Sequence, residues 1–169
     1  MKYCLDANVF IEAHRRYYSF DIAPPFWESL VQWGTEQILC GTSLVYEDLV
    51  KNNDDELCRW AKTDGSSLFI SPDVDTYRYI GEIGDLVTRQ YKTHQAEAFM
   101  DCSDPWVIAY AKSNNLVVVT MEVLRQEQPD RIDGKIAGKK IQIPNICQKV
   151  GVEYIDTFRL LRELNFSFR

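Results

Sequence analysis

Short apolar runs that alternate with helix-like segments constrain the fold of this chain more than any other feature of its sequence. The apolar, partly β-branched runs predict strands at 2–5, 38–40, 67–71, 116–120 and 152–155. Other segments have the pattern of helices, and these lie at 8–18, 24–37, 43–52, 54–62, 73–91, 104–114 and 157–165. Because strands that alternate with helices favour a mainly parallel sheet, we predict an α/β fold.

The size and composition of the chain are typical of one globular domain, which we expect to span residues 1–169. The hydrophobic share is 46% and the charged share 26%, as in ordinary soluble proteins. No apolar run reaches the roughly 20 residues that a membrane span needs. The start "MKYCLDANVF" has one lysine and no long apolar stretch, so we expect no signal peptide and a cytoplasmic protein. The five cysteines form no CxxC pair, which argues against a zinc cluster or a disulfide framework.

Four carboxylates are predicted to meet at one edge of the sheet. Asp6 follows the first strand, and Glu122 lies two residues after the strand 116–120. The carboxyl ends of parallel strands lie at the same edge, where sites form in open α/β sheets. Asp48 lies inside a predicted helix and Asp104 begins another. Crowded acids repel each other and resist ionisation, and a hard divalent cation such as Mg²⁺ or Mn²⁺ relieves that cost.

Each of these acids also has a simpler interpretation when it is taken alone. Asp6 and Asp104 can be ordinary helix caps, and Glu122 an ordinary loop acid. Asp48 can lie on a solvated helix face, in which case Glu47 beside it can be the acid that faces inward. The prediction of a metal site therefore depends on the four acids together.

Four stretches of the sequence carry a resemblance to a known family: "YCLDANVFIEA", "VYEDL", "DPWVIAYAKSNNLVVVTME" and "KIQIPNICQKVGVEYIDTFRLLREL". Together they resemble a PIN domain, and more narrowly a bacterial PIN-like family of unknown function that is related to VapC-type toxins. The resemblance covers nearly the whole chain. It implies a three-layer α/β/α fold with a mainly parallel central sheet.

The resemblance also implies a function and a set of site residues. PIN domains are metal-dependent ribonucleases with three or four acids at the carboxyl edge of the sheet. The matching acids, implied to be catalytic and to hold Mg²⁺ or Mn²⁺, are Asp6, Asp48, Asp104 and Glu122, and the supporting residues are Asn8 and Thr120. Two positions depart from the usual pattern, since PIN domains commonly have glutamate in place of Asp48 and aspartate in place of Glu122.

By the same resemblance we expect an endoribonuclease in which a metal-activated water attacks the RNA phosphodiester and leaves a 5′ phosphate and a 3′ hydroxyl. The protein would be the toxin of a toxin–antitoxin pair, with an antitoxin protein as partner, and such domains often form homodimers.

The uneven distribution of charge is compatible with an RNA substrate. The formal net charge of −6 argues mildly against a nucleic-acid partner, since phosphate binding usually shows a basic face. Residues 123–149, however, contain six basic and three acidic side chains, so this segment carries +3 and the remainder −9. A local basic edge can bind phosphates even in an acidic protein, although a solvated loop is an equally good interpretation. The candidate RNA-binding residues are Arg15, Arg16, Arg125, Lys139 and Lys140.

Two other functions are compatible with parts of the pattern. The first is a PIN-like module that has lost catalysis and acts by binding, although all four acidic positions keep a carboxylate. The second is a phosphotransferase or receiver-like protein with Asp6 as nucleophile. Phosphatases of that kind need a second aspartate two residues later, where this chain has Asn8.

Overall fold

A five-stranded parallel sheet forms the centre of the molecule. The computed structural model describes residues 2–51 and 54–168. Its strands are β1 (Tyr3–Leu5), β2 (Leu39–Thr42), β3 (Phe69–Ile70), β4 (Val117–Val119) and β5 (Tyr154–Ile155), in the order β3-β2-β1-β4-β5. Each described strand pair is parallel, which confirms the predicted α/β fold.

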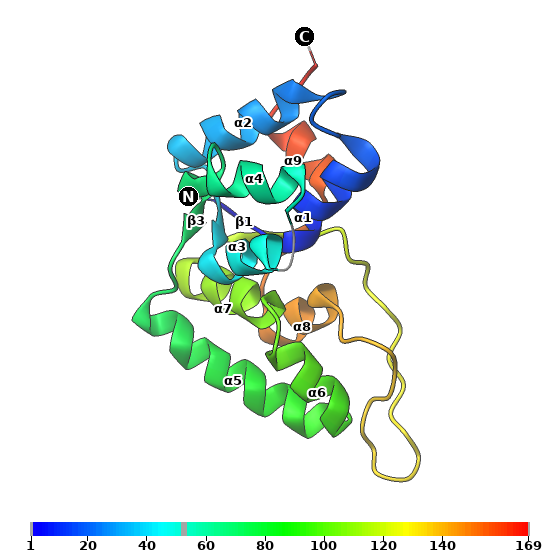
Figure 1. Cartoon of the computed structure of the whole chain (residues 1–169). Helices are drawn as coiled ribbons and strands as arrows, with labels where there is room; N and C mark the ends of the chain where they lie inside the picture. Colours follow the sequence, from blue (N-terminus) through cyan, green and yellow to red (C-terminus); the bar gives the residue numbers. More distant parts are fainter. Residues whose placement is uncertain (1, 52–53, 169) are drawn as a thin grey trace.

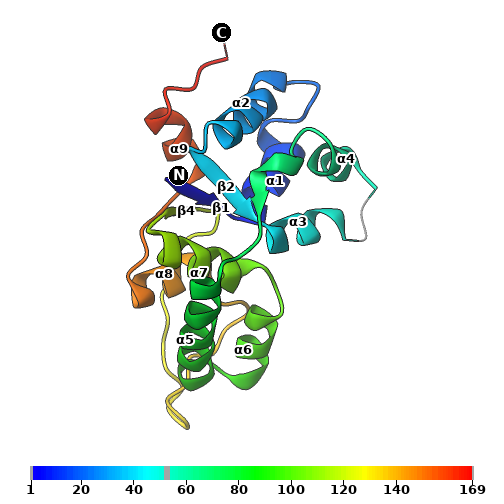
Figure 2. The ribbon, with the colours of Figure 1, turned by 90° about the vertical axis from the view of Figure 1, so that its left-hand side faces the viewer.

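Helices cover both faces of this sheet, so the fold has three layers (Figures 1 and 2). Helices α7 and α8 lie against one face with α5 and α6 outside them, and α1, α2 and α9 lie on the other side. The α-helices of the described residues are α1 (Ala7–Glu12), α2 (Pro24–Thr35), α3 (Ser43–Val50), α4 (Glu56–Lys62), α5 (Val74–Gln90), α6 (Thr93–Met100), α7 (Asp104–Asn114), α8 (Ile143–Val150) and α9 (Thr157–Glu163). A π-helical segment η1 (Ala13–Tyr17) continues α1, and a 3₁₀ turn η2 (Ser66–Leu68) precedes β3.

The buried core lies on both faces of the sheet, and the part that positions the site lies between β1, β4 and α7. All three residues of β1 are buried, as are Val118 and Val119 of β4. Helix α7 is apolar on nearly all sides because it is covered by the sheet on one side and by α5 on the other. It ends at Asn115, whose left-handed backbone (φ 53°) stops the helix. This packing places the first residue of α7 beneath the carboxyl ends of β1 and β4.

Several boundaries differ from the prediction, and two helices were missed. Helix α6 is short and weakly periodic, so the sequence has little signal for it. Helix α8 has Pro144 in its first turn and Gly151 (φ 71°) at its end, and both residues favour a helix between them. The predicted strand 67–71 is largely η2 followed by a two-residue strand. The end of the predicted helix 43–52 lies outside the described residues.

A long loop (residues 121–142) connects β4 to α8 and extends away from the body of the molecule (Figure 1). It is anchored at the junction of α5 and α6. The Ile136 amide donates to the Gln90 carbonyl at 2.7 Å, and the Lys92 amide donates to the Ile136 carbonyl at 3.1 Å. The Lys92 ammonium also pairs with Asp133 at 2.8 Å. The loop therefore returns to the sheet along a defined path.

No helix among the described residues is long and apolar enough to cross a membrane.

Candidate active site

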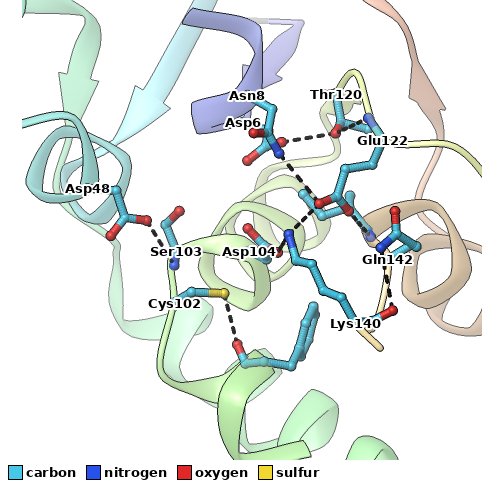
Figure 3. Close-up of polar contacts among 12 residues, drawn as sticks. Asp6, Asn8, Asp48, Cys102, Ser103, Asp104, Thr120, Glu122, Lys140 and Gln142 are labelled. Carbon is cyan, nitrogen blue, oxygen red and sulfur yellow. Dashed lines mark hydrogen bonds and ion pairs between the residues drawn. The ribbon is translucent and has the colours of Figure 1, made fainter. Parts of the chain in front are cut away.

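A cavity of about 520 Å³ opens at the carboxyl edge of the sheet. Its walls come from the β1–α1 junction, from α3, α6 and α7, and from the end of the long loop (Figure 3). Of the residues predicted for the site, Asp6, Asn8, Asp48, Asp104, Lys139 and Lys140 line it. Helix α6 contributes a wall that the sequence analysis missed, including His94 and Phe99.

Asp6 is fully buried at the end of β1. Its side chain makes no capping hydrogen bond to α1, so the simple cap interpretation does not hold for the described structure. The Thr120 hydroxyl donates to Asp6 Oδ2 at 2.9 Å, whereas Oδ1 has no hydrogen-bond partner among the described residues. Burial, together with the nearby Asp104 and Glu122 carboxylates, raises the pKa of Asp6 to about 7.

Asp104 is the first residue of α7, with its side chain 7% exposed. The cap position itself belongs to Ser103. Asp104 Oδ2 lies 3.1 Å from the Lys140 ammonium, an ion pair that lacks the geometry of a hydrogen bond. Burial raises the pKa of Asp104, while the ammonium of Lys140 acts in the opposite direction. The cavity is thus lined by two largely buried carboxylates, each with an oxygen that accepts no hydrogen bond from the described residues.

Glu122 is already engaged with three donors. Its Oε2 accepts from the Ile143 amide at 2.7 Å, at the first turn of α8. Its Oε1 accepts from Asn8 Nδ2 at 3.4 Å and from the Lys140 ammonium. Thr120 also accepts from the Glu122 amide at 3.1 Å, which holds the turn after β4. Glu122 therefore lies beside the other acids as predicted, but its oxygens bind the protein's own donors.

Asp48 reaches the cavity from α3, on the side away from Glu122 (Figure 3). Its Oδ2 accepts from the Ser103 amide at 3.3 Å, directly before Asp104. The neighbouring Glu47 is exposed to solvent and does not line this cavity. Of the two acids that the sequence left open, Asp48 is the one that faces the site.

Lys140 has a position that the sequence analysis did not foresee. Its ammonium lies between Asp104 and Glu122, and its side chain is 50% exposed (Figure 3). Partial burial opposes its charge, but the Asp104 and Glu122 carboxylates raise the pKa of Lys140 above its usual value. The lysine thus provides the positive charge that this group of acids otherwise lacks.

The three arginines predicted to bind RNA do not line the cavity. Arg15 and Arg16 are exposed on η1, and Arg16 pairs with Glu12 at 3.2 Å. Arg125 is exposed in the long loop. Its amide donates to Asn145 Oδ1 at 3.0 Å, and its carbonyl accepts from Asn145 Nδ2 at 2.8 Å. It borders a separate depression beside α8. The structure therefore does not gather the five basic residues into one patch at the cavity.

The fit of a metal ion depends on how many protein ligands it needs. Within the described ranges, no three His, Cys, Asp or Glu side chains come close enough together to hold an ion by themselves. Mg²⁺, however, commonly takes one or two carboxylates and completes its shell with waters and substrate phosphates. The unsatisfied oxygens Asp6 Oδ1 and Asp104 Oδ2 suit that arrangement, since both are hard donors facing one cavity.

Comparison with solved structures confirms the fold class. A chain of VapBC-1 from nontypeable Haemophilus influenzae has a TM-score of 0.54 at 14% identity, and the match covers 92% of this chain and 98% of that chain. The crystal structure of VapBC2 from Rickettsia felis, bound to a DNA fragment from its promoter, matches with the same TM-score, identity and coverage. Identity this low shows a shared fold alone, so the chain has the same α/β fold as these chains of VapBC assemblies.

The sequence profile of the family described as "Domain of unknown function (DUF4411)" matches residues 3–168, so the chain belongs to this family. No curated protein matches the sequence.

Proposed function

We propose that this protein is a metal-dependent endoribonuclease of the PIN type and acts as the toxin of a toxin–antitoxin pair. The observation that carries the proposal is the pair of buried carboxylates, Asp6 and Asp104, each with an unsatisfied oxygen facing one cavity. They come from segments far apart in the sequence, and their burial opposes their own charge. The Lys140 ammonium offsets part of this cost at Asp104, and a bound cation would offset the rest. Buried acids of this kind are typical of a functional site.

We assign separate roles to the acids and to Thr120 in this proposal. Asp6 and Asp104 would hold Mg²⁺ or Mn²⁺, which supplies a polarised phosphate and a more acidic water. Thr120 fixes Asp6 by donating to Oδ2, which leaves Oδ1 for the ion. Asp48 and Glu122 would orient the site from its two sides, Asp48 through the Ser103 amide and Glu122 through α8. Hydrolysis would leave a 5′ phosphate and a 3′ hydroxyl.

Lys139 and Lys140, at the rim of the cavity, are the basic residues best placed to meet the phosphate backbone of RNA. Arg15, Arg16 and Arg125 would act farther along the strand. The antitoxin partner is proposed by analogy with the VapBC assemblies that share this fold. A homodimer and a cytoplasmic location belong to the same proposal.

The test is cleavage of a structured RNA pool in Mn²⁺ or Mg²⁺, repeated with a chelator and with three variants. Asp6→Asn and Asp48→Asn should lose cleavage, whereas Glu47→Gln should keep it because Glu47 lies outside the cavity. Cleavage that survives Asp6→Asn would point to a contaminating nuclease. If the folded protein, freed of any antitoxin, cuts no RNA under any condition, the binding module without catalysis becomes the better interpretation.

A further inference from the structure

The Lys140 ammonium lies between two buried carboxylates, those of Asp104 and Glu122. It is 3.1 Å from Asp104 Oδ2 and donates to Glu122 Oε1. The two carboxylates are almost inaccessible, with side chains 7% and 8% exposed, whereas the lysine side chain is 50% exposed. The lysine therefore reaches two buried acids from the solvent side of the cavity.

The main chain that carries Lys140 is anchored, so only its side chain would need to move for the ammonium to leave the cavity. Ile141, the next residue, is 2% exposed in the core. Ile136, four residues earlier, is bonded to Gln90 and Lys92. Apart from its contacts with Asp104 and Glu122, no ion pair holds the Lys140 ammonium within the described chain. Rotation of the side chain alone can carry the ammonium out of the cavity while the loop remains in position.

An ion bound at Asp6 and Asp104 would share a ligand with this lysine. Asp104 Oδ2 is the oxygen that contacts the ammonium and also one of the two oxygens without a hydrogen-bond partner. Two like charges that share one buried oxygen repel each other strongly at such short separation. The ammonium and the metal ion cannot both occupy that oxygen without a large loss of free energy.

We propose that Lys140 is a built-in competitor for the metal ion, which neutralises Asp104 and Glu122 when no metal is bound and swings out when the ion enters. This inference rests on the metal site of the proposed function and adds a regulation to it. The protein would keep a stable, inactive form at low metal concentration without any partner. Once displaced, the ammonium would be released at the rim of the cavity, beside Lys139.

The first test measures Mn²⁺ affinity by calorimetry in the absence of RNA, for the wild type, Lys140→Met and Lys139→Met. Methionine keeps much of the length of lysine and removes its charge. Lys140→Met should bind Mn²⁺ about tenfold more tightly, because the competing charge is gone. Lys139→Met is the matched control, since Lys139 lines the same cavity but forms no described ion pair with these acids, and its affinity should change less than about twofold. With chelator present, Lys140→Met should melt at a lower temperature than the wild type.

A second test needs no variant and uses amine-reactive labelling of the wild type followed by mass spectrometry. Saturating Mn²⁺ should increase the labelling rate of Lys140 several-fold and leave that of Lys139 nearly unchanged, because the ion frees the ammonium of Lys140.

Unchanged or weaker Mn²⁺ affinity in Lys140→Met, or labelling that Mn²⁺ does not accelerate, would overturn the inference. If cleavage still depended on metal and on Asp6, the proposed ribonuclease would stand while the competition would not. If neither the wild type nor Lys140→Met bound Mn²⁺, both the competition and the metal dependence of the proposed function would fail.

Discussion

At the scale of single residues, Asp6 lies where a charged carboxylate lowers the stability of the fold. It is fully buried and has an unsatisfied oxygen, and two further carboxylates lie nearby. A side chain placed only for stability would not keep a charge there, since desolvation and repulsion both oppose it. Residues that break such local rules are expected at functional sites.

We predict that Asp6→Asn stabilises the metal-free protein while abolishing its proposed cleavage of RNA. The pKa of Asp6 is raised to about 7 in the folded state, so the folded state binds more protons than the unfolded state between about pH 4 and pH 7. The wild type should therefore lose stability as the pH rises through this window, and the variant should lose less. Near pH 8 the variant should be more stable by on the order of 2 kcal/mol.

The measurement is thermal or urea unfolding in chelator across pH 5 to 8.5 for both proteins. If the free energy of unfolding changed with pH equally in the wild type and in Asp6→Asn, the charge of Asp6 would not lower the stability of the fold.

At the scale of secondary-structure elements, Asp73 joins two helices. It is the cap of α5, where Oδ1 accepts from the Thr76 amide at 2.8 Å and from the Thr76 hydroxyl at 2.6 Å. The same carboxylate accepts from Ser113 and Asn114 at the end of α7, each at 3.1 Å. Asp73 therefore holds the start of the outer helix against the end of the buried one.

Removal of this cap by Asp73→Ala should cost about 1 kcal/mol at pH 7. The Thr76 hydrogen bonds, foremost among the causes, lower the pKa of Asp73 to about 2, below its value in the unfolded chain. A lowered pKa stabilises the fold above the unfolded value near 3.8 and loses that contribution as the pH falls toward 2. The difference in urea unfolding between the wild type and the variant should thus be smaller at pH 3 than at pH 7, and an equal difference at both would contradict the ionic role.

Alanine should have opposite effects on stability at two glycines, because the space available for a Cβ differs between them. A Cβ at Gly65 would lie 2.8 Å from ring carbons of Trp60, which is 7% exposed and packed against Phe10 and Trp27. A Cβ at Gly81, exposed in the middle of α5, would meet no atom within 4 Å. Gly65→Ala should cost about 1–3 kcal/mol, whereas Gly81→Ala should gain about 0.5–1 kcal/mol. Chemical denaturation of both variants tests this, and a stabilising Gly65→Ala would show that the ring yields easily.

At the scale of the whole molecule, the proposed metal site should couple ligand binding to global stability. An ion that binds only the folded chain at about 100 times its Kd stabilises it by about 2.7 kcal/mol, which corresponds to several degrees in Tm for a chain of this size. Mn²⁺ should therefore raise the Tm of the wild type by about 5 °C, and this rise should largely disappear in Asp104→Asn. An equal rise in Asp104→Asn would place the bound ion elsewhere.

The architecture, and the meeting of Asp6 with Asp104, could be predicted from the pattern of strands and helices. Alternating strands and helices leave few topologies other than a parallel sheet between helical layers. In such a sheet an acid after β1 and an acid opening the buried α7 meet at the carboxyl edge, whatever the loops do. The family resemblance pointed to the same edge, and the described fold agrees with it.

The contacts of each charged side chain at that edge depend on the packing of segments that are far apart in the sequence. The rotation of α3 about its axis decides which of the two adjacent acids faces the cavity, and Asp48 does so rather than Glu47. The apolar pattern of this short helix does not specify that rotation. The binding of Glu122 to the first turn of α8 and the place of Lys140 between two acids depend on the path of the long loop. That loop has no periodic pattern from which its path could be predicted. Its path is set by hydrogen bonds to the distant α5–α6 junction, and the local sequence of the loop does not specify such long-range contacts.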